Sequence, residues 1–432
     1  MTEILGEDRR AIEAAGPGRG VVAVAGGLAV FGLATYGYLG FAGRALEAEV
    51  FAPLSVLWTL LNAIGIGLFL PFEQELGRRT AARRAAGEGN APVVRHSARA
   101  ALVLLGVVAL LTAVATGSLS ARLFSGNGVL VLLFILALAG MAAAYLIRGL
   151  LSGGGFFGRY GAQLAADGVI RAVWAGALFA SGSQDLAAYG VVLVGAPVLA
   201  VLLTTPRLSR IVEPGPAHDA SVAVAALATL IGASVLSQLL ANAGPVVVQL
   251  LAGPLDQEAS GQFTAALVIA RVPLFAFAAV QAVLLPGLAA LVGAGEVVRF
   301  RERVRLVGLV TLALGLVGTA LVWILGARLV PLLFGPDFSI ARVVITLIAL
   351  SGAAFMIAQV LAQALLALGA DRWVLVGWAA GLATLVAAAL LGPGSLTERA
   401  AWALVVGGMA AVAVLSVGLV RRTPRASSVS AT

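Results

Sequence analysis

The sequence contains no cysteine and no lysine, and it carries little charge for its length. Only 11% of the 432 residues are charged and 61% are hydrophobic, whereas soluble domains are about 25% charged. This composition excludes a soluble enzyme. The lack of cysteine excludes disulfides and thiolate metal sites, and the lack of lysine excludes a lysine Schiff base.

Nucleic-acid binding is also excluded, although the formal net charge is +8. A nucleic-acid surface gathers basic residues on one face together with aromatic partners. Here the arginines occur between long apolar runs. That distribution is typical of the loops of a membrane protein.

The apolar runs predict an all-α polytopic membrane protein. A helix that crosses about 30 Å of hydrocarbon needs about 20 apolar residues, and we count twelve such runs. The excess length of three of them can be absorbed by tilt or by kinks at Pro245, Pro273 and Pro286. The predicted spans are residues 20–41, 50–72, 98–118, 129–151, 164–182, 186–204, 222–252, 262–292, 304–326, 340–369, 373–392 and 399–420.

The arginines predict the orientation of these spans, because arginine-rich loops stay in the cytoplasm. With the N-terminus inside, most of the 28 basic residues fall in inner loops. Both termini are therefore predicted to be cytoplasmic. They comprise an N-terminal segment at 1–19, which precedes an uncleaved first helix, and a tail at 421–432.

Short matches at a common offset predict two related halves. Glu49 recurs as Glu258, and Ala121-Arg122-Leu123 recurs as Ala327-Arg328-Leu329. Six helices per half give both halves one orientation, so they are predicted to be related by a pseudo-twofold axis along the membrane normal. We expect lobes at 20–204 and 222–420, a linker at 205–221 and a central cavity.

Arg271 is the clearest ionisable residue within a predicted span. Such groups are costly in hydrocarbon and face a bundle interior or a water-filled cavity. We expect Arg271 to face a cavity that receives an anion. The alternative is a structural arginine that pairs with a carboxylate of a neighbouring helix or extends to the membrane surface.

The fifth span carries Gln163, Asp167, Arg171 and Trp174 on one helical face. Asp167 and Arg171 are four residues apart and can neutralise each other. This pair is either purely structural or opens for substrate, in which case Arg171 engages phosphate and Asp167 carries a coupling proton.

Uncharged polar residues form further candidates for a cavity lining. In the seventh span they make a stripe, which serves either as hydrogen-bonding contact between helices or as cavity lining. The second and tenth spans contribute fewer polar residues. For these residues we favour hydrogen bonding between helices over cavity lining. The candidates are Gln238, Asn242 and Gln249 in the seventh span, Asn62 in the second, and Gln359 and Gln363 in the tenth.

Residues 73–84 follow the second span with two acidic residues and four arginines. We interpret this segment as a cytoplasmic loop that sets orientation and anchors anionic lipid. No catalytic, metal-binding or nucleotide-binding motif accompanies it, since His96 and His218 lack ligand spacing. We therefore expect neither enzymatic activity nor a cofactor.

Several stretches resemble the multidrug/oligosaccharidyl-lipid/polysaccharide (MOP) flippase superfamily. The resemblance is to its bacterial polysaccharide-exporter branch of the O-antigen flippase (Wzx-like) type, and it extends over essentially the whole chain. It rests on residues 68–76 (LFLPFEQEL), 148–153 (RGLLSG), 157–161 (FGRYG) and 331–335 (PLLFG).

The resemblance implies a flippase in the bacterial inner (plasma) membrane. It implies two six-helix lobes around a cavity that opens alternately to each side, and export of an undecaprenyl-pyrophosphate-linked saccharide. Arg271 fits the cavity cations of that branch, and Arg171 fits less well. Implied partners are the lipid-linked saccharide, membrane lipids and polysaccharide assembly enzymes. The alternatives are a drug/cation antiporter of the same superfamily and a nontransporting scaffold for polysaccharide assembly.

Overall fold

The computed structural model describes residues 17–205, 207–208, 211–216, 221–253, 256 and 258–423. Every regular element in this part of the chain is a helix, and it contains no strand. The predicted all-α fold class is therefore confirmed. Most of the predicted N-terminal segment and of the predicted C-terminal tail lies outside the described residues.

The chain divides into two compact units. The first comprises the described parts of Met1–Leu46 and Gly65–Ile231, and the second those of Glu47–Ile64 and Gly232–Thr432. Residues 47–64 thus group with the second unit, although the sequence analysis places them in the N-terminal lobe.

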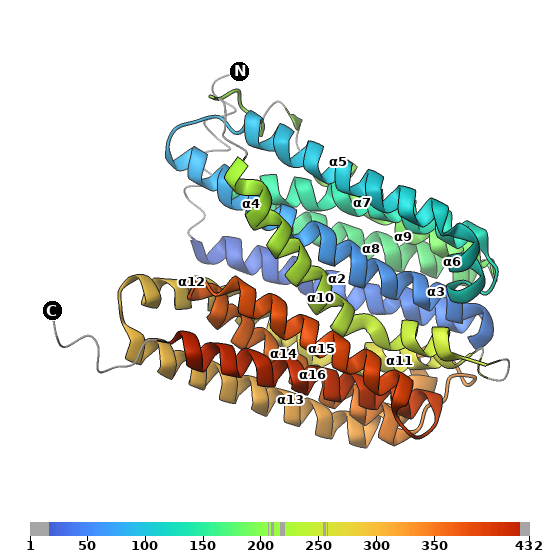
Figure 1. Ribbon diagram of the computed structural model, residues 1–432. Helices are drawn as coiled ribbons and strands as arrows, with labels where there is room; N and C mark the ends of the chain where they lie inside the picture. Colours follow the sequence, from blue (N-terminus) through green and yellow to red (C-terminus); the bar gives the residue numbers. More distant parts are fainter. Residues whose placement is uncertain are drawn as a thin grey trace. The chain divides into compact units, whose positions relative to one another are not determined.

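The helices of the two units are labelled in Figure 1. The first unit contains α2 (Pro17–Ala45), α4 (Ile66–Ala85), α5 (Ala91–Val114), α6 (Thr116–Leu123), α7 (Gly128–Gly153), α8 (Phe157–Ala180) and α9 (Leu186–Thr204). The second contains α3 (Ala48–Leu60), α11 (Ala259–Ala270), α12 (Val272–Gly293), α13 (Val297–Phe334), α14 (Arg342–Ala367), α15 (Asp371–Leu391) and α16 (Leu396–Arg422). A π-helical turn, η1 (Leu61–Gly65), joins α3 to α4, and α10 (Ser221–Leu251) begins in the first unit and continues in the second.

Within the described residues, ten helical stretches are long and apolar enough to cross a membrane. They match ten of the twelve predicted spans. The other two spans correspond to α8, which carries Asp167 and Arg171, and to the pair α11 and α12, which is interrupted at Arg271. Polar residues explain the first difference. In the second, the helix stops at Arg271 and restarts as α12, which is itself 22 residues long and apolar.

The second predicted span is too short at its C-terminal end. The α3–η1–α4 stretch runs without a loop from Ala48 to Ala85. Glu73 is 8% exposed inside it, so our interpretation of residues 73–84 as a loop is wrong. The helix continues because the arginines that follow Glu73 are good helix formers, and because Glu73 has buried partners described below.

The exposed surface of the long helices is apolar. Helix α13 exposes Leu309, Leu316, Val317, Leu321 and Ile324 by half or more. A soluble protein rarely exposes so large an apolar surface. Contact with lipid hydrocarbon explains it.

Part of the predicted linker packs against the first unit. Asn90, which is buried, donates from Nδ2 to the carbonyl oxygen of Ile211 at 2.9 Å and accepts from the backbone N–H of Glu213 at 3.0 Å. The N–H of Ala91 donates to the carbonyl oxygen of Glu213 at 2.9 Å. These bonds fix the linker to the turn between α4 and α5.

Candidate functional site

Arg271 lies at the break between α11 and α12. It is the C-cap residue of α11 and the N-cap residue of α12. Its φ and ψ angles of −98° and 2° interrupt the α-helical path. Pro273 lies in the first turn of α12, where the missing proline N–H costs nothing because the first turn has no helical acceptor for it. The sequence therefore restarts the helix just after Arg271.

The guanidinium group of Arg271 contacts the amide stripe of α10. Arg271 Nη1 donates to Asn242 Oδ1 at 2.7 Å. Asn242 Nδ2 in turn donates to the backbone carbonyl of Gln238 at 2.9 Å and to its Oε1 at 3.2 Å. Three residues selected from the sequence are thus joined in one hydrogen-bonded chain.

A small cavity of about 10 Å³ adjoins Arg271. Such a volume holds about one water molecule. The other eight lining residues are uncharged, and Arg271 supplies the formal charge. They are Leu240, Ala241, Leu274, Ser351, Gly352, Phe355, Leu404 and Gly408.

The two helix ends at the break carry opposite partial charges. Arg271 is the C-cap of α11 and the N-cap of α12, so the partial negative charge of one helix end meets the partial positive charge of the next. The formal charge of the Arg271 guanidinium is therefore what favours an anion at this site.

Asp167 and Arg171 form the ion pair that their spacing predicts. Arg171 Nε donates to Asp167 Oδ1 at 2.7 Å, and Nη2 donates to Oδ2 at 3.1 Å. Both residues are buried in the first unit, and the guanidinium carbon lies 5.3 Å from the centre of the Phe31 ring. In this structure the pair is closed, so each charge neutralises the other.

The remaining sequence candidates lie apart from the Arg271 cavity lining. Gln249 accepts a hydrogen bond from Ser260 Oγ at 2.5 Å, and Asn62 donates to the backbone carbonyl of Trp58 at 2.8 Å. Gln363 has a buried Oε1 without a hydrogen-bond partner, and Gln359 is half-buried. A role for these four side chains in substrate binding stays a prediction.

Sequence reasoning missed a buried polar cluster in the first unit. Arg148 Nε donates to Glu73 Oε2 at 2.8 Å, and Tyr160 Oη donates to Glu73 Oε1 at 2.7 Å. The Arg148 guanidinium also lies 4.0 Å above the centre of the Tyr145 ring. The sequence does contain a signal for this pair, because Glu73 and Arg148 have opposite charge and each lies at the end of an apolar run.

Comparison with known proteins gives a structural likeness alone. No family model and no curated protein matches the sequence. Among solved structures, an Asp-to-Asn variant of the Vibrio cholerae MATE transporter VcmN has a TM-score of 0.68 at 15% identity, covering 93% of this chain and 95% of that one.

Two further structures of similar fold come from the MOP superfamily. An inward-facing multidrug resistance MATE transporter has a TM-score of 0.68 at 17% identity, covering 89% of this chain and 92% of that one. A Pyrococcus furiosus MOP transporter, described as having a binding pocket of reverse polarity that suggests a different function, has a TM-score of 0.66 at 17% identity, with coverage of 93% and 94%. The chain therefore has the two-lobed helical fold of MATE transporters of the MOP superfamily.

Proposed function

We propose that the protein is a membrane transporter that works by alternating access on a substrate with an anionic group. The observation that carries this proposal is the placement of Arg271. The guanidinium lies at a helix break, lines a cavity whose other residues are uncharged, and donates to Asn242 Oδ1. A cationic substrate would be repelled from this position.

The polarity of the site supports an anionic substrate over a cationic drug. A cation antiporter needs acidic groups that face its substrate, because a carboxylate offsets the charge of the cation. In the second unit the charge beside the cavity is Arg271. The similarity to a MOP transporter that is described as having a pocket of reverse polarity fits this reasoning.

As the substrate class we propose a lipid-linked saccharide with a pyrophosphate group, moved from the inner to the outer leaflet. A polyprenyl chain can stay in hydrocarbon while the head group crosses, so the transporter has mainly to offset the desolvation of the head group. Arginine binds phosphate with paired, charged hydrogen bonds. Gln238 and Asn242, which are joined to Arg271, offer amides for sugar hydroxyls.

The membrane potential supplies a driving force for this direction. An inside-negative potential favours outward movement of anions by about 2.3 kcal/mol per charge for each 100 mV. If the positive charge of Arg271 moved outward together with the substrate, the favourable free energy from the potential would be smaller. The cavity of about 10 Å³ is too small for a saccharide, so we expect the helices around Arg271 to separate when substrate binds.

A drug/cation antiporter is the second candidate, and Asp167 favours it. This carboxylate is buried within α8, and Arg171 occupies both of its oxygens. In that mechanism the pair opens and Asp167 takes up a proton or a cation. Loss of drug export in an Asp167→Asn variant that still accumulates in the membrane would favour this candidate.

The test of the proposal is export in cells that depend on this protein for surface polysaccharide. We expect Arg271→Ala to abolish export while the protein still accumulates in the membrane, and Arg271→Lys to retain part of it, because lysine keeps the charge without the bidentate geometry. Arg305→Ala, which removes an exposed arginine of α13, is the control. Normal surface polysaccharide with Arg271→Ala would contradict the proposal.

A further inference from the structure

A groove of about 440 Å³ opens on the first unit, between α2, α4, α7 and α8. Its volume is within the range of about 300–1,000 Å³ that small-molecule sites occupy. Gly77 and Gly153 line it where α4 and α7 approach closely, because a side chain on either glycine would overlap the facing helix. The groove belongs to a different unit from Arg271.

One wall of the groove is apolar. Val24 of α2, Ala81 of α4 and Phe157 of α8 line it, and Phe157 is 43% exposed. An exposed phenylalanine at a helix start, next to an alanine and a valine, offers contact to a hydrocarbon chain. This lining fits one segment of an acyl chain.

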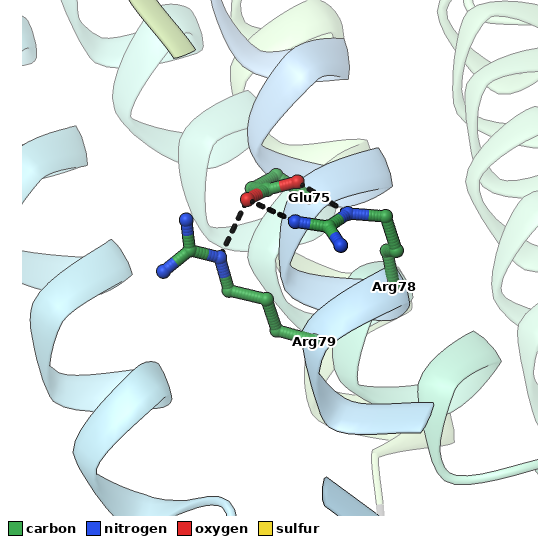
Figure 2. Close-up of polar contacts among 3 residues, drawn as sticks. All are labelled: Glu75, Arg78 and Arg79. Carbon is green, nitrogen blue, oxygen red and sulfur yellow. Dashed lines mark hydrogen bonds and ion pairs between the residues drawn. The ribbon is translucent and has the colours of Figure 1, made fainter. Parts of the chain in front are cut away.

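The rim of the groove carries excess positive charge. Figure 2 shows Glu75 between Arg78 and Arg79. Arg78 donates to this carboxylate from Nε at 2.9 Å and from Nη2 at 2.8 Å, and Arg79 donates from Nε at 2.5 Å. Two arginines share the one carboxylate, so Glu75 does not fully neutralise Arg78.

Arg78 is available to a ligand. It lines the groove, and its side chain is 68% exposed. Glu73 also lines the groove, but its charge is offset by Arg148 and Tyr160 binds its other oxygen. Arg84 reaches the carbonyl oxygen of Gly154, beside Gly153 of the lining. The groove therefore presents positive charge at its rim.

We propose that this groove binds an anionic phospholipid. The acyl chain lies along Val24, Ala81 and Phe157, and the phosphate contacts Arg78. Exposed arginines cannot remain in hydrocarbon, so this end of the unit lies at the level of the lipid head groups. Clustered arginines at that level attract anionic lipids. The site does not depend on what the protein transports.

The test measures lipid bound to the purified full-length chain by native mass spectrometry, with phosphatidylglycerol and phosphatidylcholine as probes. We expect phosphatidylglycerol to be preferred by about fivefold, because both lipids carry a phosphate but only phosphatidylglycerol has a net negative charge, and this is about the attraction of one arginine for an anionic lipid surface. Arg78→Gln should abolish that preference. Ala81→Trp should fill the groove and weaken binding of phosphatidylglycerol.

Matched variants outside the groove serve as controls. Ala82→Trp adds the same side chain at the next exposed position of α4, and Arg303→Gln removes an exposed arginine of α13. Both should bind phosphatidylglycerol like the native chain. Because Ala81 is exposed, its variant keeps the fold, which thermal unfolding verifies.

Three results would overturn the proposal. The first is equal binding of the two probe lipids. The second is unchanged phosphatidylglycerol binding in both groove variants. The third is binding of a polyprenyl phosphate in the absence of phosphatidylglycerol binding, which would assign the groove to another lipid.

Discussion

The arginines of the membrane region differ in their surroundings. Arg148 and Arg171 are buried, and each bonds a carboxylate of its own unit. Burial of an ion is costly unless it is paired and hydrogen-bonded, so these two arginines suit a structural role. Arg271 lines a cavity whose other lining residues are uncharged, and this position suits contact with an anionic ligand.

The Asp167–Arg171 pair gives a prediction at this scale. Asp167→Asn leaves the Arg171 charge buried without its carboxylate, which should lower the free energy of unfolding by about 3–5 kcal/mol. Thermal unfolding of the purified protein in detergent measures the effect. Glu302→Gln, at an exposed position of α13, is the matched control.

Replacement of both partners distinguishes the cost of an unpaired buried charge from the cost of losing two polar side chains. The double variant Asp167→Leu, Arg171→Leu removes the uncompensated charge, and we expect it to unfold at a higher temperature than Asp167→Asn alone. If Asp167→Asn unfolds at the temperature of the control, the buried pair does not stabilise the first unit.

At the scale of elements, glycines let the helices approach closely. A Cβ atom on Gly161 of α8 would overlap the backbone carbonyl of Ala23 in α2, and one on Gly27 would overlap the carbonyl of Gly161. Backbone atoms cannot move aside as a flexible side chain can. Small residues at such crossings are typical of membrane helices, whose association depends on close van der Waals contact.

Helix α8 offers its own control for this contact. Gly161→Ala should destabilise the packing of α2 and α8 by about 1–3 kcal/mol, the usual cost of overpacking. Gly158→Ala, one turn earlier, meets no atom within 4 Å and should be tolerated. Thermal unfolding of the two variants measures the difference. Equal unfolding temperatures would show that the close contact is not required.

The apolar runs predict where the helices are, and local contacts explain where the prediction fails. Hydropathy marks all twelve runs, because each is a long segment with few charges. It does not show that α4 continues past Glu73, since the partners Arg148 and Tyr160 are distant in sequence. The break at Arg271 depends on a backbone turn, which the neighbouring Pro273 suggests but does not fix at one residue.

The same distinction applies to the candidate site. Arg271 stands out because a charge within an apolar run is costly, and Asn242 and Gln238 stand out by helical spacing. Their hydrogen-bonded chain needs the packing of α10 against the helix break. Periodicity gives the polar face of a helix, but it does not show which neighbour that face contacts.

At the scale of the whole molecule, the chain order does not follow the division into units. Residues 47–64 belong to the second unit, although they lie between segments of the first. Residues 211–213 bond Asn90 of the first unit. Hydropathy and the short repeats predict two halves, but they do not show which helices group with which unit. That assignment depends on contacts between side chains.

The central claim is that the substrate is an anion recognised by Arg271. Purified protein in phospholipid vesicles tests it directly, by comparing movement of a pyrophosphate-linked saccharide lipid with uptake of a cationic drug. We predict that the native chain moves the pyrophosphate lipid and not the drug, and that Arg271→Ala stops this movement. Drug uptake coupled to protons, or movement of the pyrophosphate lipid at the native rate by Arg271→Ala, would contradict the account.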